Sequence, residues 1–217
     1  MRAIAIIFLF ISCALSAQVM RVSPSHSSST ASVSYQTYTD NFDSYADNSQ
    51  LAGQSFWVSE IGDWQVNIPS TDGSVHPDID NGESSVYYNK PFGDDQYSQA
   101  VVESIGVPYI GVTVRNSSDS YYGWDCNSSG SRAYIVVAGS RTNWDTGDSW
   151  LTNDIVKITV TGDVISYYRN GSLDTSIDTD GVITYEGADK LSSGYPGVGG
   201  WNDGSNSRLD SWEGGTN

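Results

Sequence analysis

Three stretches of the sequence set Trp or Tyr beside short polar side chains. They are Arg115 with Tyr121-Tyr122 and Trp124-Asp125, Asn143-Trp144-Asp145 with Trp150, and Trp201-Asn202-Asp203. A pyranose ring presents an apolar C–H face to an aromatic ring, while Asp, Asn, Arg and backbone groups bond its hydroxyls. The predicted carbohydrate-binding residues are therefore Arg115, Tyr121, Tyr122, Trp124, Trp144 and Trp201.

The tryptophans do not all suit this role. Trp144 and Trp201 are flanked by Asn and Asp, which favours exposure. Trp57, Trp64 and Trp212 lie in strand-like segments, where a large aromatic residue is more typical of a core. We therefore expect Trp144 and Trp201 to be the rings that a ligand can reach.

Histidine and cysteine offer little further chemistry. The chain holds only His26 and His76, and no nucleophile-elbow motif supports a Ser/His/Asp triad. Cys13 lies in the N-terminal leader, which leaves Cys126 without a partner for an intramolecular disulfide. We expect Cys126 to be a small, buried apolar residue, and the core alone to hold the fold.

The charge balance excludes two classes of partner. The net charge is −16 although only 17% of the residues are charged, because Lys and Arg are scarce. Such a surface repels the phosphates of nucleic acids and the headgroups of anionic lipids. We therefore expect neither nucleic acid nor a membrane surface as the main partner.

The first 39 residues are predicted to form two segments outside the folded domain. Residues 1–17 have the positive head, short apolar run and small-residue exit of a secretory signal, and the run is too short to span a bilayer comfortably. This predicts an extracellular or cell-surface protein, with a lipoprotein anchored at Cys13 as the alternative. Residues 18–39 form a Ser/Thr-rich arm or linker, in which the alternation at 31–36 leaves room for a strand that pairs with another subunit.

The segment 155–177 has the clearest secondary-structure pattern. Apolar and polar residues alternate from Ile155 to Thr161, which predicts a strand with one face toward water. A turn at Gly162-Asp163, a returning strand to Tyr168, an Asn170-Gly171 turn and a third strand over 172–177 complete a β-meander. Similar short strands, separated by Gly, Asn and Asp, recur along the chain. Residues 40–217 are therefore predicted to form one all-β domain, an antiparallel two-sheet β-sandwich.

The order of several segments resembles the concanavalin A-like, or laminin G-like, jelly-roll superfamily of lectins, carbohydrate-binding domains and glucanases. The resemblance covers about Asp40 to the C-terminus and implies a jelly-roll fold. It also implies a structural Ca²⁺ near paired terminal strands, where Asp40, Asp43 and Asp210 could converge; ordinary solvated Asp is the alternative. The residues that carry the resemblance are Asp40-Asn41-Phe42-Asp43, Trp57, Trp64, Gln96–Gln99, Gly111–Arg115, Tyr121-Tyr122, Gly162–Gly171, Gly194–Gly199 and Leu209–Glu213.

Glucanases of this superfamily carry Glu-x-Asp-x-x-Glu on one strand, where two carboxylates cleave the glycosidic bond. The nearest match is the segment 78–83, which contributes Asp78, Asp80 and Glu83. It begins with Asp instead of Glu, and Asn81-Gly82 would break the strand that must hold the pair. This favours a solvated loop and no catalytic residue.

Three Asn-x-Ser sequons predict glycosylation in surface loops of an exported chain, at Asn116, Asn127 and Asn170. Together these features favour a secreted, non-catalytic, lectin-like jelly-roll protein that binds an extracellular glycan. One alternative is a structural subunit of an extracellular filament or surface layer, assembled through residues 18–39. The other is a glycoside hydrolase that uses Asp78, Asp80 and Glu83.

Overall fold

The computed structural model describes residues 36–68, 73–78, 82–202 and 206–217. In these ranges the chain forms sixteen β-strands and no helix, as the turn-rich composition predicts. It follows that no helix in the described part of the chain is long and apolar enough to cross a membrane. The predicted signal at 1–17 and most of the arm at 18–39 lie outside the described residues.

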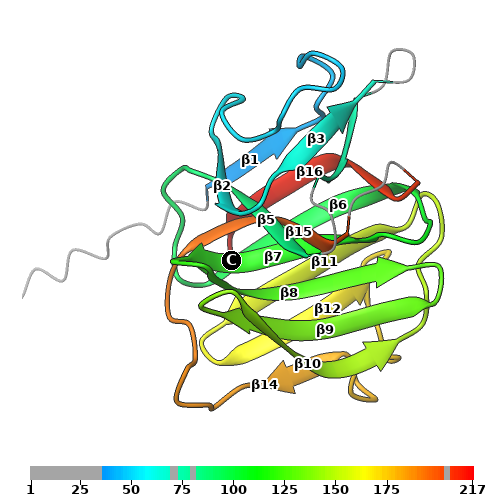
Figure 1. The fold of residues 1–217 in the computed structure, drawn as a ribbon. Helices are drawn as coiled ribbons and strands as arrows, with labels where there is room; N and C mark the ends of the chain where they lie inside the picture. The colour runs from blue at the N-terminus through cyan, green and yellow to red at the C-terminus, as the bar shows by residue number, and fades with distance from the viewer. Residues whose placement is uncertain (1–35, 69–72, 79–81, 203–205) are drawn as a thin grey trace, which may run out of the picture. The chain divides into compact units, whose positions relative to one another are not determined.

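The strands form two antiparallel sheets, which we call sheet A and sheet B. Figure 1 shows β7 to β10 of sheet B in front of β11 and β12 of sheet A. Sheet A has the order β13 (Ser172–Leu173), β12 (Val164–Arg169), β11 (Ile155–Thr161), β6 (Gln96–Ser104), β16 (Arg208–Thr216), β4 (Ser74–Pro77) and β3 (Trp64–Asn67), with β1 (Thr37–Asp40) paired to β16 and β14 (Val182–Thr184) to β12. Sheet B has the order β10 (Ser140–Gly147), β9 (Gly130–Val137), β8 (Ser120–Asn127), β7 (Tyr109–Ser117), β15 (Tyr195–Trp201), β5 (Glu83–Tyr88) and β2 (Trp57–Ile61).

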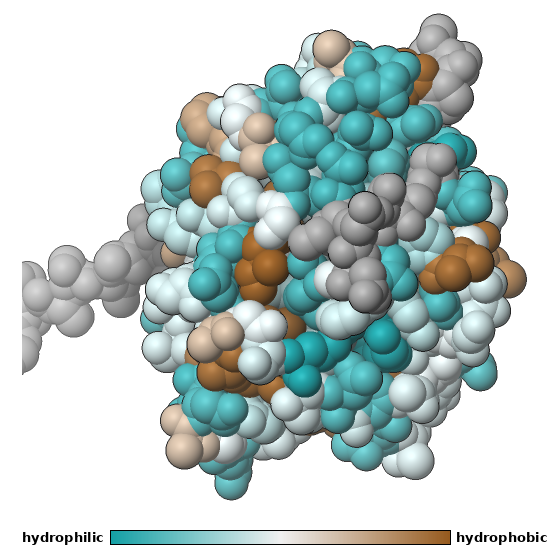
Figure 2. All heavy atoms as spheres, viewed as in Figure 1, coloured by the Kyte–Doolittle hydropathy of each residue, from teal (hydrophilic) through white to brown (hydrophobic). Residues whose placement is uncertain are grey.

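The core lies between the inner faces of the two sheets. On β11 the residues Val156, Ile158 and Val160 are fully buried, and the alternate residues face outward, as the period-2 pattern predicts. Trp57, Trp64 and Trp212 are also in the core, which confirms their assignment. Outside the core, Figure 2 shows a surface that is mostly hydrophilic, with apolar residues in scattered places.

The central meander forms as predicted, apart from its last strand. Asn170 and Gly171 have φ values of 55° and 79°, the positive angles of a type I′ turn between β12 and β13. However, β13 has two residues, not the six predicted for 172–177. The chain leaves the sheet because the Asp174 carboxylate accepts bonds from the Ser176 backbone N–H and hydroxyl, 3.1 and 2.7 Å away, which stabilise a turn.

The two ends of the domain pair with each other. Strand β1 runs antiparallel to β16, with Thr37 opposite Gly215 and Asp40 opposite Trp212. The last three residues of the predicted arm, Thr37 to Thr39, therefore belong to a strand of sheet A. Cys126 is free and fully buried, as predicted.

Candidate functional site

A row of polar and aromatic side chains crosses the outer face of sheet A. The strand registers place Tyr168 opposite Lys157, Lys157 opposite Gln99, and Gln99 opposite Glu213. Thr39 on β1 lies opposite Glu213 and completes the row. Adjacent strands are about 4.8 Å apart, so the row of five residues spans roughly 19 Å. Residues separated by up to 174 positions in the sequence, Thr39 and Glu213, thus share one surface.

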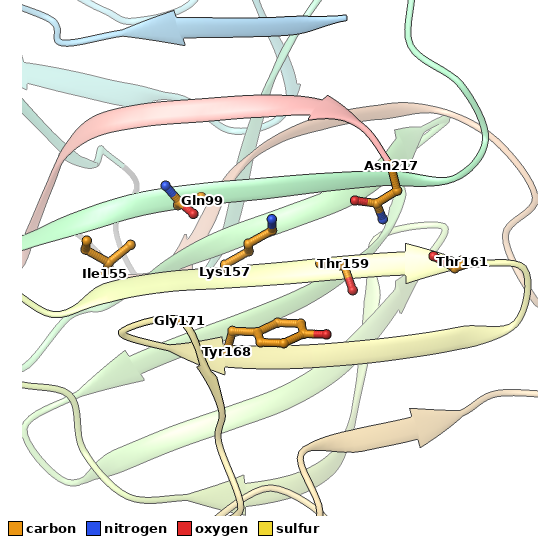
Figure 3. A pocket seen from close by; sticks show the side chains of 8 residues that line it. All are labelled: Gln99, Ile155, Lys157, Thr159, Thr161, Tyr168, Gly171 and Asn217. Carbon is orange, nitrogen blue, oxygen red and sulfur yellow. The ribbon is translucent and has the colours of Figure 1, made fainter. Parts of the chain in front are cut away.

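One end of this row opens into a hollow of about 460 Å³, which we call the sheet A hollow. Figure 3 shows the Tyr168 ring and the Lys157 side chain on the same face, between Gln99 on β6 and the turn that contains Gly171. A volume of this size is within the range of pockets that bind small ligands. The lining residues are Gln99, Ile155, Lys157, Thr159, Thr161, Tyr168, Gly171 and Asn217.

A second tyrosine supports the floor of the sheet A hollow. The Lys157 Nζ lies 4.0 Å from the centroid of the Tyr97 ring, and the Tyr97 hydroxyl donates a hydrogen bond of 2.6 Å to Glu213. Gly215 makes room for this ring, because a Cβ there would lie 2.5 Å from the Tyr97 Cε1. Burial lowers the pKa of Lys157, and the Glu213 charge acts in the opposite direction. The ammonium therefore lies over the Tyr97 ring, and the Tyr97 ring is held by Glu213.

The C-terminal residue forms one rim of the sheet A hollow. The Asn217 side-chain amide donates to the carbonyl oxygens of Gln96 and Val160, at 3.1 and 3.3 Å. Its backbone N–H donates to the Asp95 carbonyl at 2.9 Å. These bonds hold the end of the chain against β6 and β11, so the rim has a defined position.

A second hollow of about 700 Å³ adjoins the first, because Gln99 lines both. Its lining includes Asp40, whose carboxylate accepts bonds from the Phe42 N–H and the Trp57 indole N–H, each 2.9 Å long, and from the Tyr45 hydroxyl. Burial and this contact raise the pKa of Tyr45. The lining residues are Thr39, Asp40, Asn41, Ser44, Tyr45, Ser55, Tyr88, Gln99, Ser211, Trp212 and Glu213.

The residues predicted to hold calcium do not fit such a site. The Asp40 carboxylate is already used by three donors, and Asp43 accepts bonds from the Gly73 N–H and the Asn41 amide, at 2.7 and 2.5 Å. Asp210 accepts a bond from the Ser211 N–H. Among the residues that the structure describes, no group of three or more His, Cys, Asp or Glu side chains could hold a metal ion.

Four of the six predicted carbohydrate-binding residues are buried. Tyr121 and Trp124 have no exposed surface, and Tyr122 and Arg115 are 2% and 3% exposed. Arg115 donates to the carbonyls of Leu191 and Asp94, at 2.5 and 3.1 Å. These four side chains therefore offer almost no surface to a sugar. Tyr122 and Trp124 face the core, Arg115 is buried at the end of β7, and Tyr121 is covered by neighbouring side chains on the outer face of sheet B.

The other two predicted residues are half-exposed, but the structure does not bring them together. Trp144 is on the edge strand β10, where it contacts Tyr185, and Trp201 ends β15 near the middle of sheet B. The Trp201 ring centroid lies 6.0 Å from the Arg141 guanidinium. Each ring thus belongs to a different part of the surface.

Of the three carboxylates of the hydrolase alternative, the structure describes Asp78 and Glu83. Asp78 lies at the surface and accepts a bond from the Gln50 amide, and Asp80 lies outside the described residues. Glu83 is buried on sheet B, where it accepts a 2.7 Å bond from the Tyr121 hydroxyl and lies 3.5 Å from Arg141. Burial raises the pKa of Glu83 to about 7, against the opposing effect of Arg141.

The three sequons differ in accessibility. Asn116 is fully buried, and its amide donates to the Tyr195 carbonyl and the Thr113 hydroxyl, at 2.7 and 2.9 Å, so the folded protein cannot accept a glycan there. Asn127 is 7% exposed and donates to the Val107 carbonyl at 2.9 Å. Asn170 is exposed, in the turn after β12.

The sequence reasoning did not identify the residues of the sheet A hollow as a site. The alternation at 155–161 correctly predicts that Lys157, Thr159 and Thr161 share an outward face. Tyr168 follows from the same pattern, since it alternates with the buried Tyr167. The missing information was the pairing of β11 with β6, which brings Gln99 beside Lys157.

Comparisons with known proteins give matches in structure but not in sequence. No family model and no curated protein matches the chain. The carbohydrate-binding module CBM66 from Bacillus subtilis superposes with a TM-score of 0.54 at 12% identity, covering 73% of this chain and 93% of that one. The Crh5 transglycosylase in complex with NAG gives 0.54 at 12% identity, covering 83% and 84%.

A protein of unknown function with a galectin-like fold from Bacillus subtilis gives a TM-score of 0.56 at 9% identity, covering 83% of this chain and 96% of that one. At such low identities these similarities concern the fold and not the activity. They agree with the two packed antiparallel sheets and the absence of helices in the described residues. The chain has the concanavalin A-like jelly-roll fold.

Proposed function

We propose that this protein binds carbohydrate, and that the sheet A hollow is the binding site. The observation that carries the proposal is the half-exposed Tyr168 ring, which lies opposite Lys157 in an open hollow of about 460 Å³. A sugar stacks its C–H face on such a ring. Lys157, Gln99 and Thr159 surround the ring with an ammonium, an amide and a hydroxyl, the groups that bond sugar hydroxyls.

The surface that would recognise the sugar is rigid. All the lining side chains except that of Asn217 project from β-strands or the tight turn after β12, so little conformational entropy is lost when a ligand binds. Lys157 is held over the Tyr97 ring, and Tyr97 is held by Glu213. The fold shared with a carbohydrate-binding module and with a transglycosylase in complex with NAG supports the same class of ligand.

The protein acts outside the cell and without catalysis in this proposal. The leader-like residues 1–17 support export. None of the side chains that line the sheet A hollow is Asp or Glu, whereas hydrolysis of a glycosidic bond uses two such carboxylates. Calcium has no part in the proposal, because the predicted Asp residues do not fit a calcium site.

Titration calorimetry of the mature chain with a panel of neutral oligosaccharides tests the proposal. We expect Tyr168→Ala to weaken binding about fivefold or more, because it removes a stacking contact worth ~1 kcal/mol. Tyr168→Phe keeps the ring and should retain most of the affinity. Tyr87→Ala is the matched control, since Tyr87 is a partly exposed tyrosine on sheet B.

Two outcomes would overturn the proposal. One is a panel in which no oligosaccharide binds, and the other is binding that Tyr168→Ala and Tyr87→Ala weaken equally. EDTA should leave the affinity unchanged, and a loss of binding in EDTA would show that calcium is needed after all.

A further inference from the structure

A separate hollow of about 450 Å³ lies at the edge of the sandwich, between β10 of sheet B and the chain around β14 of sheet A. In Figure 1 these two strands lie next to each other at the bottom of the view. We call this the edge pocket. Its lining residues are Asn143, Trp144, Asp145, Asp178, Ile183 and Tyr185.

Trp144 reaches the edge pocket because of an irregularity in β10. The register with β9 shifts between Asn143 and Asp145, so Trp144 is the extra residue of a β-bulge. Its ring packs against Tyr185 and Tyr122, with centroids 4.7 and 5.6 Å away, and remains half-exposed. Bulges often redirect a side chain in this way, and here Trp144 and Tyr185 form an aromatic surface in the edge pocket, with the buried Tyr122 behind them.

Two carboxylates, those of Asp145 and Asp178, lie beside this surface. Asp145 accepts bonds from the backbone N–H groups of Asp178 and Thr146, at 2.5 and 2.8 Å. Within the described part of the chain, neither Asp145 nor Asp178 forms an ion pair with Lys, Arg or His. None of the lining residues is basic. The edge pocket therefore combines aromatic faces with uncompensated negative charge.

We propose that the edge pocket binds the ammonium-bearing ring of an amino sugar of the glucosamine type. A cation is attracted both to carboxylates and to the electron-rich faces of Trp and Tyr. The apolar C–H face of the sugar stacks on Trp144, and the Asn143 amide bonds a hydroxyl. The chain's net charge of −16 draws such a cation toward the surface, and the pocket selects it.

The edge pocket is structurally separate from the sheet A hollow, and the two binding proposals can be tested separately. It shares no residue with that hollow, which carries the ammonium of Lys157 and suits neutral ligands. A failure of binding at one site leaves the other proposal standing. The ligand classes also differ, since one is neutral and the other cationic.

The test compares two oligosaccharides of equal length in titrations with the mature chain. One is a deacetylated glucosamine oligomer, which is cationic, and the other is the N-acetylated form, which is neutral. We expect the cationic oligomer to bind about tenfold more tightly, through the two carboxylates and the aromatic rings. Trp144→Ala should remove most of this preference although it changes no charge. Tyr87→Ala, which lies outside both sites, is the control and should leave the preference intact.

Asp178→Asn provides a second variant that leaves the backbone undisturbed, because Asp178 has φ 44° and Asn tolerates that conformation. We expect it to lower the affinity for the cationic oligomer about threefold, since one of the two carboxylates is lost. Equal binding of the two oligomers would overturn the proposal. So would a preference that both Trp144→Ala and Asp178→Asn leave unchanged, because the attraction would then be diffuse and due to net charge alone.

Discussion

The Tyr121 hydroxyl donates a hydrogen bond of 2.7 Å to the Glu83 carboxylate on the outer face of sheet B. Both side chains are buried, although they lie on the side of the sheet away from the core. Two arginines share this cluster with Asp125, since Arg132 and Arg141 both bind its carboxylate. The outer face of sheet B is thus filled by its own side chains, whereas the outer face of sheet A carries the open hollow.

This burial gives Glu83 a marked effect on pH-dependent stability. Its pKa rises to about 7 in the folded state, so the folded protein favours the neutral acid. The stabilisation that the protonated Glu83 gives to the folded state is complete below the ordinary pKa of a glutamate side chain. It is lost as the pH rises through 7. We expect Glu83→Gln to be more stable relative to wild type at pH 8 than at pH 4, with a difference of up to about 3 kcal/mol. Urea unfolding at the two pH values measures it, and a constant difference would contradict the assignment.

Gly123 on β8 allows the Tyr134 ring to lie across the strand. A Cβ at this position would be 2.2 Å from the Tyr134 Cζ, and the ring is fully buried. We expect Gly123→Ala to destabilise the fold by about 1–3 kcal/mol, because the ring must shift in a packed site. Urea unfolding of the two single variants and of the Gly123→Ala/Tyr134→Ala double variant checks the cause. The double variant should be more stable than the sum of the single effects predicts, and strict additivity would rule out the clash.

Two shortened forms of the chain, one with β1 and one without it, measure how much this strand contributes to stability. A protein that begins at Gln36 keeps β1, including the packing of Tyr38 on Tyr88 and Phe92 and the Asp40 bond to Trp57. A protein that begins at Asn41 loses all of these. We expect the shorter form to be about 2 kcal/mol less stable, with a melting temperature lower by roughly 5 °C. Equal melting temperatures would mean that β1 adds nothing to the domain.

The same forms test the assembly alternative. If the chain that begins at Gln18 forms filaments and the chain that begins at Gln36 stays monomeric, residues 18–35 drive assembly. Light scattering and negative-stain microscopy distinguish these outcomes. If neither form assembles, the filament hypothesis is wrong.

Cys126 should be unreactive in the folded protein. Burial raises the pKa of its thiol to about 11. The sulfur accepts a hydrogen bond from the Trp150 N–H at 3.1 Å, and the thiol donates one to the Asn127 carbonyl at 3.2 Å. We expect a thiol reagent at pH 8 to react slowly with the native protein and fully after denaturation. Fast reaction of the native protein would show that the site opens.

The local pattern of the sequence determined the class of fold and much of the strand detail. The alternation of Val156, Ile158 and Val160 identified the buried face of β11, and Asn170-Gly171 identified a turn, because both depend on neighbours in the chain. The order of the motifs also indicated the jelly roll.

Only the tertiary structure decided which residues share a surface. The pairing of β11 with β6 brings Lys157 beside Gln99, and the bulge in β10 places Trp144 against Tyr185. Aromatic-rich segments such as Tyr121–Trp124 had suggested an exposed ligand surface, yet they are buried on both faces of sheet B. Side-chain alternation tells which residues share a face, but strand order and register come from long-range contacts between sheets, which no local pattern contains.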